Sequence, residues 1–375
     1  MRPPRHNLPP DRESPAEILA PEEHDLASLD ARSLVAMAEG TSVHIDQAAP
    51  TRKRWVLPLR LAVSGVMLLV LYLRIPEFSW HDLIPDWSAT TALWAAAAVI
   101  ATVIAVALSA ARWQRVLHGL GVAIPLGLLL PITFAGQFVS NVLPTTIGGD
   151  VLRVTRLGRH TGDNAGAFAS VSLERLTGWL VLPLISWTGF ALDASLRDLG
   201  RATSVALTIG AVTLLGLIVI LVAAGLPGLG GRMVAEAGWR RFLGAVHLGV
   251  GRLRRHPLDA LGVVVAGAAF QLVLCGAAYA AARVAGIDSV SFTAILAFYP
   301  AVLVAQVLPL GISGLGVREG AFVLFLEPLG VQAEHAVALG LLLYLLNLIG
   351  SLVGAPAFAA GGPERSVRAP SAAAP

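Results

Sequence analysis

The feature that most constrains the fold is a series of long apolar segments separated by short charged loops. A helix needs about 20 mostly apolar residues to cross a bilayer core about 30 Å thick. Charged residues make up only 14% of the chain, whereas soluble domains carry about a quarter. The sequence therefore predicts an all-α polytopic membrane protein. We expect full transmembrane helices over residues 55–73, 90–111, 165–192, 202–226, 258–282 and 333–358.

Two further apolar segments, 124–143 and 292–308, are interrupted by proline and glycine. They run into VLPTTIGGDVLR, from Val142 to Arg153, and VLPLGISGLGVR, from Val307 to Arg318, which align without a gap. Broken elements at corresponding positions of two halves indicate a transport site at a repeat interface. We therefore expect two re-entrant or broken helices, and about six to eight transmembrane helices in all.

The placement of charge predicts the topology. A basic cluster at 52–54 precedes the first apolar segment, and a long arginine-rich loop follows the segment 202–226, so both are expected in the cytoplasm. An odd number of predicted crossings lies between the two proline-glycine motifs, which indicates inverted-topology repeats, about 90–226 and 258–358. Both termini are then cytoplasmic, and the cytoplasmic membrane is the expected location.

The expected domains are an acidic, disordered cytoplasmic tail over 1–50, a membrane domain over 51–360 and a disordered Ala/Pro-rich tail over 361–375. Cys275 is the only cysteine, which excludes an intrachain disulfide and a thiolate metal cluster. The chain has no phosphate-loop, HExxH or GxSxG motif, and its histidines lack ligand spacing. We expect no catalytic residues, metal, cofactor or nucleic-acid partner.

The two broken elements carry the main candidate site. Glycines tolerate the positive φ angles of a tight reversal, and the free N–H groups at a helix start favour an anion. Arg153 and Arg318 could then hold a phosphate with a planar fork of donors. The alternative is that the glycines only turn a hairpin and the arginines reach to the interface. The glycines concerned are Gly148, Gly149, Gly311, Gly314 and Gly316.

Glu174 and Arg175 lie inside a predicted span, where each ionisable group costs about 2.5–3.5 kcal/mol. Glu174 is interpreted either as a proton-linked or headgroup-binding carboxylate, or as a structural partner of Arg153 or Arg318. Asp150 and Glu319 flank those arginines and either orient them, bind an amine or stay exposed. In the last span, small and polar residues form a stripe typical of close helix packing, namely Asn347, Gly350, Ser351 and Gly354.

The motifs FVSNVLPTTIGGDVLRVTRLGR, SLERLTG and LPLGISGLGVREGAF together resemble the membrane region of lysylphosphatidylglycerol synthases, a flippase-like family, over about residues 55–360. The resemblance implies that headgroup or phosphate contacts come from the matching positions. The first motif contributes Asn141, Pro144, Gly148, Gly149, Asp150 and Arg153, and the second Glu174 and Arg175. The third contributes Pro309, Ser313, Gly314, Gly316, Arg318 and Glu319.

The resemblance favours a lipid translocase for a phospholipid or a polyprenyl-phosphate-linked lipid. One alternative is a membrane-embedded transferase or accessory subunit in lysyl-phospholipid or lipid-linked glycan synthesis, with Asp150, Glu174 or Glu319 as base. Another is a scaffold that recruits enzymes through its acidic tail. Because little chain follows Phe358, we expect no aminoacyl-transferase domain and no enzyme activity. The expected partners are membrane lipids and a lipid-modifying enzyme or glycosyltransferase encoded elsewhere, and oligomerisation stays open.

Overall fold

The computed structural model describes residues 87–142, 148–225, 257–307 and 314–361, together with positions 65, 66, 69, 247 and 251. Within these residues the regular structure is helical throughout. Apart from those positions, the predicted span 55–73 lies outside the described residues, as do the N-terminal tail and nearly all of the arginine-rich loop and the C-terminal tail. So do Pro144, Pro309, Gly311 and Ser313 of the two motifs.

Five described helices are long and apolar enough to cross a membrane, which confirms an all-α polytopic fold. They are α3 (Ala89–Gly119), α6 (Asn164–Leu192), α7 (Arg201–Gly225), α9 (Pro257–Val284) and α12 (Ala333–Ser351), the last extended by η6 (Leu352–Gly354) and α13 (Ala355–Ala359). Shorter helices make up the rest of the bundle: α4 (Leu126–Val142), α5 (Gly148–Thr161), α10 (Phe292–Ala305) and α11 (Val317–Leu326). Two 3-10 turns, η3 (Ala194–Asp198) and η5 (Glu327–Leu329), complete the described elements.

Local sequence explains where several of these helices begin. The side chains of Ser88, Asp163 and Ser291 accept hydrogen bonds from backbone N–H groups at the starts of α3, α6 and α10, at 3.1, 2.8 and 3.1 Å. Each bond satisfies a donor that the first helical turn leaves unpaired. Such caps fix the entry point of an otherwise uniformly apolar helix.

Helix α3 is longer than predicted. The predicted span 90–111 was expected to end near residue 111, and that boundary is wrong. The helix continues to Gly119 because its next turns are also buried, with Trp113 and Val116 fully enclosed. Arg112 therefore lies within the helix and is only 5% exposed.

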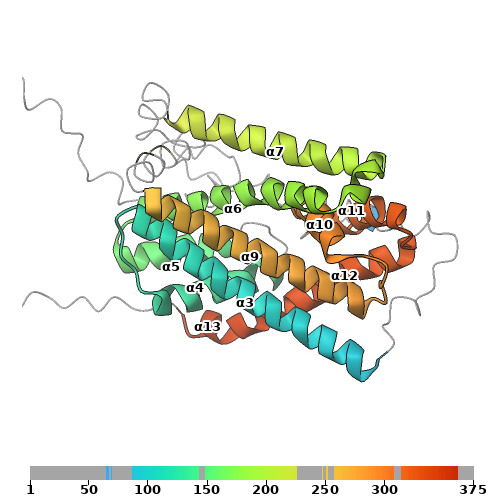
Figure 1. Ribbon diagram of the computed structural model, residues 1–375. Helices are drawn as coiled ribbons and strands as arrows, with labels where there is room; N and C mark the ends of the chain where they lie inside the picture. Colours follow the sequence, from blue (N-terminus) through green and yellow to red (C-terminus); the bar gives the residue numbers. More distant parts are fainter. Residues whose placement is uncertain are drawn as a thin grey trace, which may run out of the picture.

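The described helices pack in two corresponding sets (Figure 1). Helices α3 and α9 run side by side across the bundle, and each precedes a short apolar helix, a second short helix and a long helix. Helix α4 packs on α5 as α10 packs on α11, and α5 on α6 as α11 on α12. Helix α10 lies against α6, and α4 lies against α12 and its continuation. This exchange of partners is the pattern expected of a structural repeat.

Two glycines at equivalent positions permit the exchange. Gly189 and Gly354 are 165 residues apart (354 − 189), the same offset as Arg153 and Arg318 (318 − 153). A Cβ atom on Gly189 would lie 2.4 Å from the nitrogen of Ala297 in α10, and one on Gly354 would lie 2.1 Å from the Phe134 oxygen in α4. Each long helix therefore receives the short apolar helix of the other half at a position where only glycine fits.

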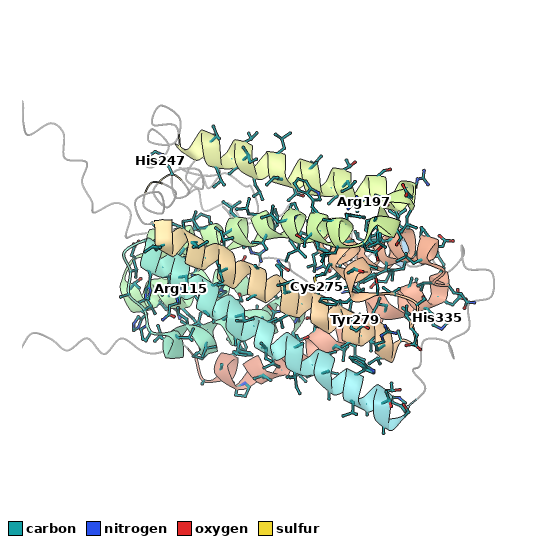
Figure 2. All side chains as sticks on the ribbon, in the orientation of Figure 1. Arg115, Arg197, His247, Cys275, Tyr279 and His335 are labelled. Carbon is teal, nitrogen blue, oxygen red and sulfur yellow. The ribbon has the colours of Figure 1, made fainter. Side chains whose placement is uncertain are left out.

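Aromatic side chains fill the interior between the two ends of the bundle. Arg115 of α3 lies toward one end, and His335 of α12 lies toward the other (Figure 2). Between them, aromatic rings fill the interior around α10, where Phe298 stacks on Phe325 at 5.3 Å and meets Phe190 edge-on at 5.3 Å.

Candidate functional site

A cavity of about 360 Å³ lies between the two halves. Its lining comes from α3, α4, α5 and α6 on one side and from α9, α10, α11 and α12 on the other. The charged side chains that line it are Arg112, Asp150, Arg153, Glu174, Arg175 and Arg318. Arg153 and Arg318, predicted from equivalent motifs, therefore reach one shared cavity.

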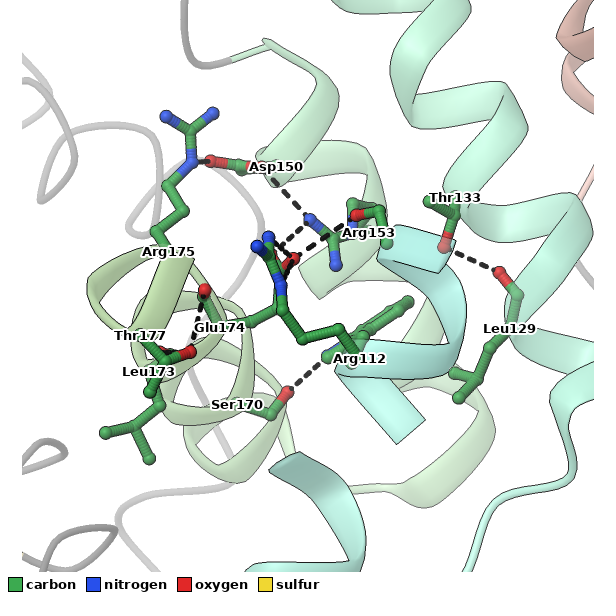
Figure 3. A network of polar contacts seen from close by, with 12 residues as sticks. Arg112, Leu129, Thr133, Asp150, Arg153, Ser170, Leu173, Glu174, Arg175 and Thr177 are labelled. Atoms are coloured by element: carbon green, nitrogen blue, oxygen red, sulfur yellow. Dashed lines mark hydrogen bonds and ion pairs between the residues drawn. The ribbon is translucent and has the colours of Figure 1, made fainter. Parts of the chain in front are cut away.

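A buried carboxylate bridges two arginines at the centre of the first half (Figure 3). Glu174 is 1% exposed, and its Oε1 accepts hydrogen bonds from Nε of Arg112 at 2.8 Å and from Nη2 of the same guanidinium. Its Oε2 accepts from Nη1 of Arg153 at 3.1 Å. The ion-pair interpretation of Glu174 is confirmed with Arg153 as partner, and the suggested pairing with Arg318 is wrong.

Aromatic rings hold both guanidinium groups in place. Arg153 lies over the ring of Trp113 at 4.3 Å, and Arg112 lies over Phe270 at 4.8 Å. Trp113 is itself fixed because its Nε1 donates to Ser170 Oγ at 3.0 Å. Cation–π contacts of this kind strengthen when water is excluded. The arginine pair is consequently oriented before any ligand arrives.

Asp150 links this network to the cavity rim. Its Oδ2 pairs with Nε of Arg175, and its Oδ1 lies 3.6 Å from Nη1 of Arg153 (Figure 3). The side chain of Arg175 is 39% exposed, whereas that of Arg153 is 8% exposed. The carboxylate therefore contacts both arginines, as the orienting role considered for it requires.

The second half uses a different arrangement around Arg318. Its Nε and Nη2 donate to Oε1 of the neighbouring Glu319 at 3.1 and 2.6 Å. The other oxygen of Glu319 accepts from the backbone N–H of Gly316 at 2.6 Å, so the carboxylate also closes the start of α11. Because Glu319 occupies this helix start, the N–H group of Gly316 is not available to an external anion, contrary to our expectation.

The predicted glycines divide into two kinds. Gly314 and Gly316 have φ angles of 77° and 86°, as a tight reversal requires. Gly148 and Gly149 lie in the first turn of α5, and the positive φ predicted for them is wrong. Gly149 is needed for close approach instead, because its Cβ would lie 2.2 Å from the Gly136 oxygen in α4.

The structure brings together most of the predicted site. Of the predicted site residues, those that line the cavity are Asn141, Gly149, Asp150, Arg153, Glu174, Arg175 and Arg318. Gly148, Gly314, Gly316 and Glu319 are not part of its lining. The small-residue stripe of α12 packs as predicted, since Gly350 faces Thr102 of α3. Asn347 does more, because it lines the cavity and its carbonyl accepts from Asn141 Nδ2 at 3.2 Å.

Sequence reasoning missed the contacts of several arginines and amides. Arg156 is 8% exposed and donates to the carbonyls of Ala357 and Phe358 at 2.8 and 3.0 Å, contacts that its sequence neighbourhood does not predict. Arg112 and Gln271 were not predicted to line the cavity. Gln271 could have been found, because it is the one amide side chain in the apolar segment 258–282.

Five apolar helices of membrane-spanning length around a polar, arginine-lined cavity define a multi-pass membrane protein with an internal polar site. The chain belongs to the family described as the lysylphosphatidylglycerol synthase TM region, which it matches over residues 57–354. No curated protein matches this chain.

Proposed function

We propose that this protein translocates lipids across the cytoplasmic membrane, moving a phospholipid or a polyprenyl-phosphate-linked lipid. The observation that carries the proposal is the meeting of Arg153 and Arg318, from equivalent positions of two repeats, in one cavity. A volume of about 360 Å³ falls in the range of small-ligand sites, about 300–1,000 Å³. The cavity therefore suits a headgroup, while the acyl chains stay in the surrounding bilayer.

In this proposal the α4–α5 and α10–α11 units are re-entrant hairpins of opposite orientation. Three helices of membrane-spanning length, α6, α7 and α9, separate the two units along the chain, and an odd number of crossings inverts them. Arg153 then faces the cytoplasm and Arg318 the outer side, with both chain termini cytoplasmic. The matched packing of the two sets of helices supports this arrangement.

We propose further that the chain is not itself an enzyme and acts on lipids made or used by an enzyme encoded elsewhere. A general base must have an oxygen free to take the substrate proton. Both oxygens of Glu174 and of Glu319 are already hydrogen-bonded, and Asp150 is paired with Arg175 through one oxygen. The family description, which names the membrane region of a synthase, keeps an accessory role in lysyl-lipid synthesis as the second candidate.

The test is lipid movement in liposomes that contain the purified protein. Vesicles carry a phospholipid with a fluorescent acyl chain, and dithionite added outside bleaches only the outer leaflet. We expect bleaching to proceed beyond the plateau of protein-free vesicles, and Arg318→Gln to slow the second phase at least roughly tenfold, because a lost charge-assisted hydrogen bond is worth about 1.5–3 kcal/mol.

The matched control is Arg159→Gln, since Arg159 is exposed at the end of α5 and is not part of the cavity lining. It should leave the rate unchanged. An Arg318→Gln protein that is correctly folded and moves lipid at the wild-type rate would contradict the role given to the arginine. Product formation from a lipid donor by the purified chain would favour the enzymatic alternative.

A further inference from the structure

The cavity has an excess of positive charge among the described residues. Four arginines line it, namely Arg112, Arg153, Arg175 and Arg318, and two carboxylates, Asp150 and Glu174. Glu319, behind the lining, pairs with Arg318. Four positive charges against three negative ones leave one positive charge. The adjoining segments 143–147 and 308–313 contain no charged residue in the sequence. A single negative charge on a ligand would balance the site.

All three carboxylates already have arginine partners. Both oxygens of Glu174 are occupied by Arg112 and Arg153, both oxygens of Glu319 by Arg318 and a backbone N–H, and Asp150 pairs with Arg175. An ammonium group entering the cavity would add a second unbalanced positive charge and would compete with the arginines for their carboxylates, and a buried charge that loses its partner is costly. The site therefore disfavours an amine-bearing headgroup, including the amine contact considered for Asp150 or Glu174.

The unpaired polar atoms point to the complementary chemistry. Among the described residues, the buried side-chain nitrogens without a hydrogen-bond partner are Nη1 of Arg112 and Nε and Nη2 of Arg153. These arginines are 5% and 7% exposed, and both line the cavity. Buried donors left unpaired are costly, and guanidinium groups bind the oxygens of phosphate closely. The free donors are therefore suited to the oxygens of one phosphodiester.

The rest of the polar lining is neutral and rich in amides. Gln271 is 5% exposed, lines the cavity, and its Oε1 accepts no hydrogen bond within the described structure. Four other amide side chains line the same cavity: Gln137, Asn141, Gln306 and Asn347. An amide group can both donate and accept hydrogen bonds, and so can a hydroxyl group, so the two can pair in either direction. This lining suits a hydroxylated, uncharged group attached to the phosphate.

We infer that the lipid recognised here is a singly charged phosphodiester whose headgroup is a neutral polyol, such as glycerol or a sugar, and that amine-bearing headgroups are rejected. The inference rests on the proposed translocation and names its substrate class. Arg112 and Arg153 receive the phosphate oxygens, and Gln271 accepts a hydrogen bond from a headgroup hydroxyl. No bond is made or broken, so the selection acts through binding alone.

The experiment compares three lipids in the dithionite assay, with the same fluorescent acyl chain on each. They are phosphatidylglycerol, with charge −1 and a glycerol headgroup, zwitterionic phosphatidylethanolamine, and cationic lysylphosphatidylglycerol. At saturating dithionite, phosphatidylglycerol should move at least roughly tenfold faster than either amine-bearing lipid, because one unbalanced charge-assisted contact corresponds to about that ratio. Equal rates for all three would overturn the inference and leave translocation intact. No movement of any lipid above protein-free vesicles would defeat both.

A charge-changing variant gives a result that loss of folding cannot produce. Gln271→Glu keeps the shape of the side chain and adds the missing negative charge, so the preference for phosphatidylglycerol over phosphatidylethanolamine should fall roughly tenfold or reverse. Gln332→Glu makes the same change at an exposed position before α12 and should keep the wild-type ratio. An unchanged ratio in a folded Gln271→Glu protein, or a wild-type protein that prefers lysylphosphatidylglycerol, would overturn the inference.

Discussion

Replacing Glu174 with glutamine removes the charge that holds two buried arginines together. Arg112 and Arg153 are 5% and 7% exposed, and both depend on this carboxylate. Removing one partner of a buried ion pair costs about 3–5 kcal/mol, because the remaining charge stays buried and unpaired. At roughly 2 °C per kcal/mol for a large domain, we expect the melting temperature in detergent to fall by about 6–10 °C.

The double variant Glu174→Gln/Arg112→Gln separates charge from packing. It removes one negative and one positive charge, so it should recover part of the loss and melt above Glu174→Gln alone. The measurement is thermal unfolding of the purified protein followed by tryptophan fluorescence, with Glu334→Gln at the start of α12 as a control outside the cavity. A Glu174→Gln protein as stable as the wild type would refute the reasoning, as would rescue by Arg318→Gln in place of Arg112→Gln.

Two further predictions concern the framework. Gly189→Ala and Gly354→Ala should each lower the free energy of unfolding by about 1–3 kcal/mol, because their Cβ atoms would lie 2.4 and 2.1 Å from backbone atoms of α10 and α4. Gly276→Ala is the control, because a Cβ atom there would have nothing within 4 Å, and it should not lower stability. Thermal unfolding of the three variants tests the prediction. Hydrogen bonds, chiefly from the hydroxyl of Ser195, lower the pKa of Asp193 below 3.8. Because this pKa is lowered in the folded state, the ionised carboxylate stabilises the fold above pH 3.8, and this stabilisation is lost as the pH falls further. Asp193→Asn should therefore lower the melting temperature at neutral pH and leave it unchanged at the acid end of a pH series.

The long helices could be predicted from the sequence because length and hydropathy alone define them. The span predicted at 165–192 is α6, Asn164–Leu192, and the two interrupted segments are the short helices α4 and α10. The correspondence of Arg153 with Arg318 was also visible, since the motifs around them align without a gap. The proline-containing linkers of these motifs lie outside the described residues, so the break itself stays a prediction.

The central ion pair could not be predicted, because its partners are far apart in the sequence. Arg112 and Glu174 are 62 residues apart. An arginine after an apolar run is typical of a membrane boundary. Here the helix continues past Arg112, and the neighbouring Trp113 is fully buried. The contacts of Arg156 could not be predicted for the same reason, since its two carbonyl acceptors lie 201 and 202 residues away along the chain.

The measurement that tests the account most directly is the transbilayer movement of fluorescent phosphatidylglycerol in vesicles containing the purified protein. The account predicts bleaching beyond the outer-leaflet plateau, slowed at least roughly tenfold by either Arg153→Gln or Arg318→Gln because each removes a charged contact to the same headgroup. A plateau equal to that of protein-free vesicles would contradict translocation. Sensitivity to only one of the two arginines would contradict the proposal that Arg153 and Arg318 act on the same headgroup.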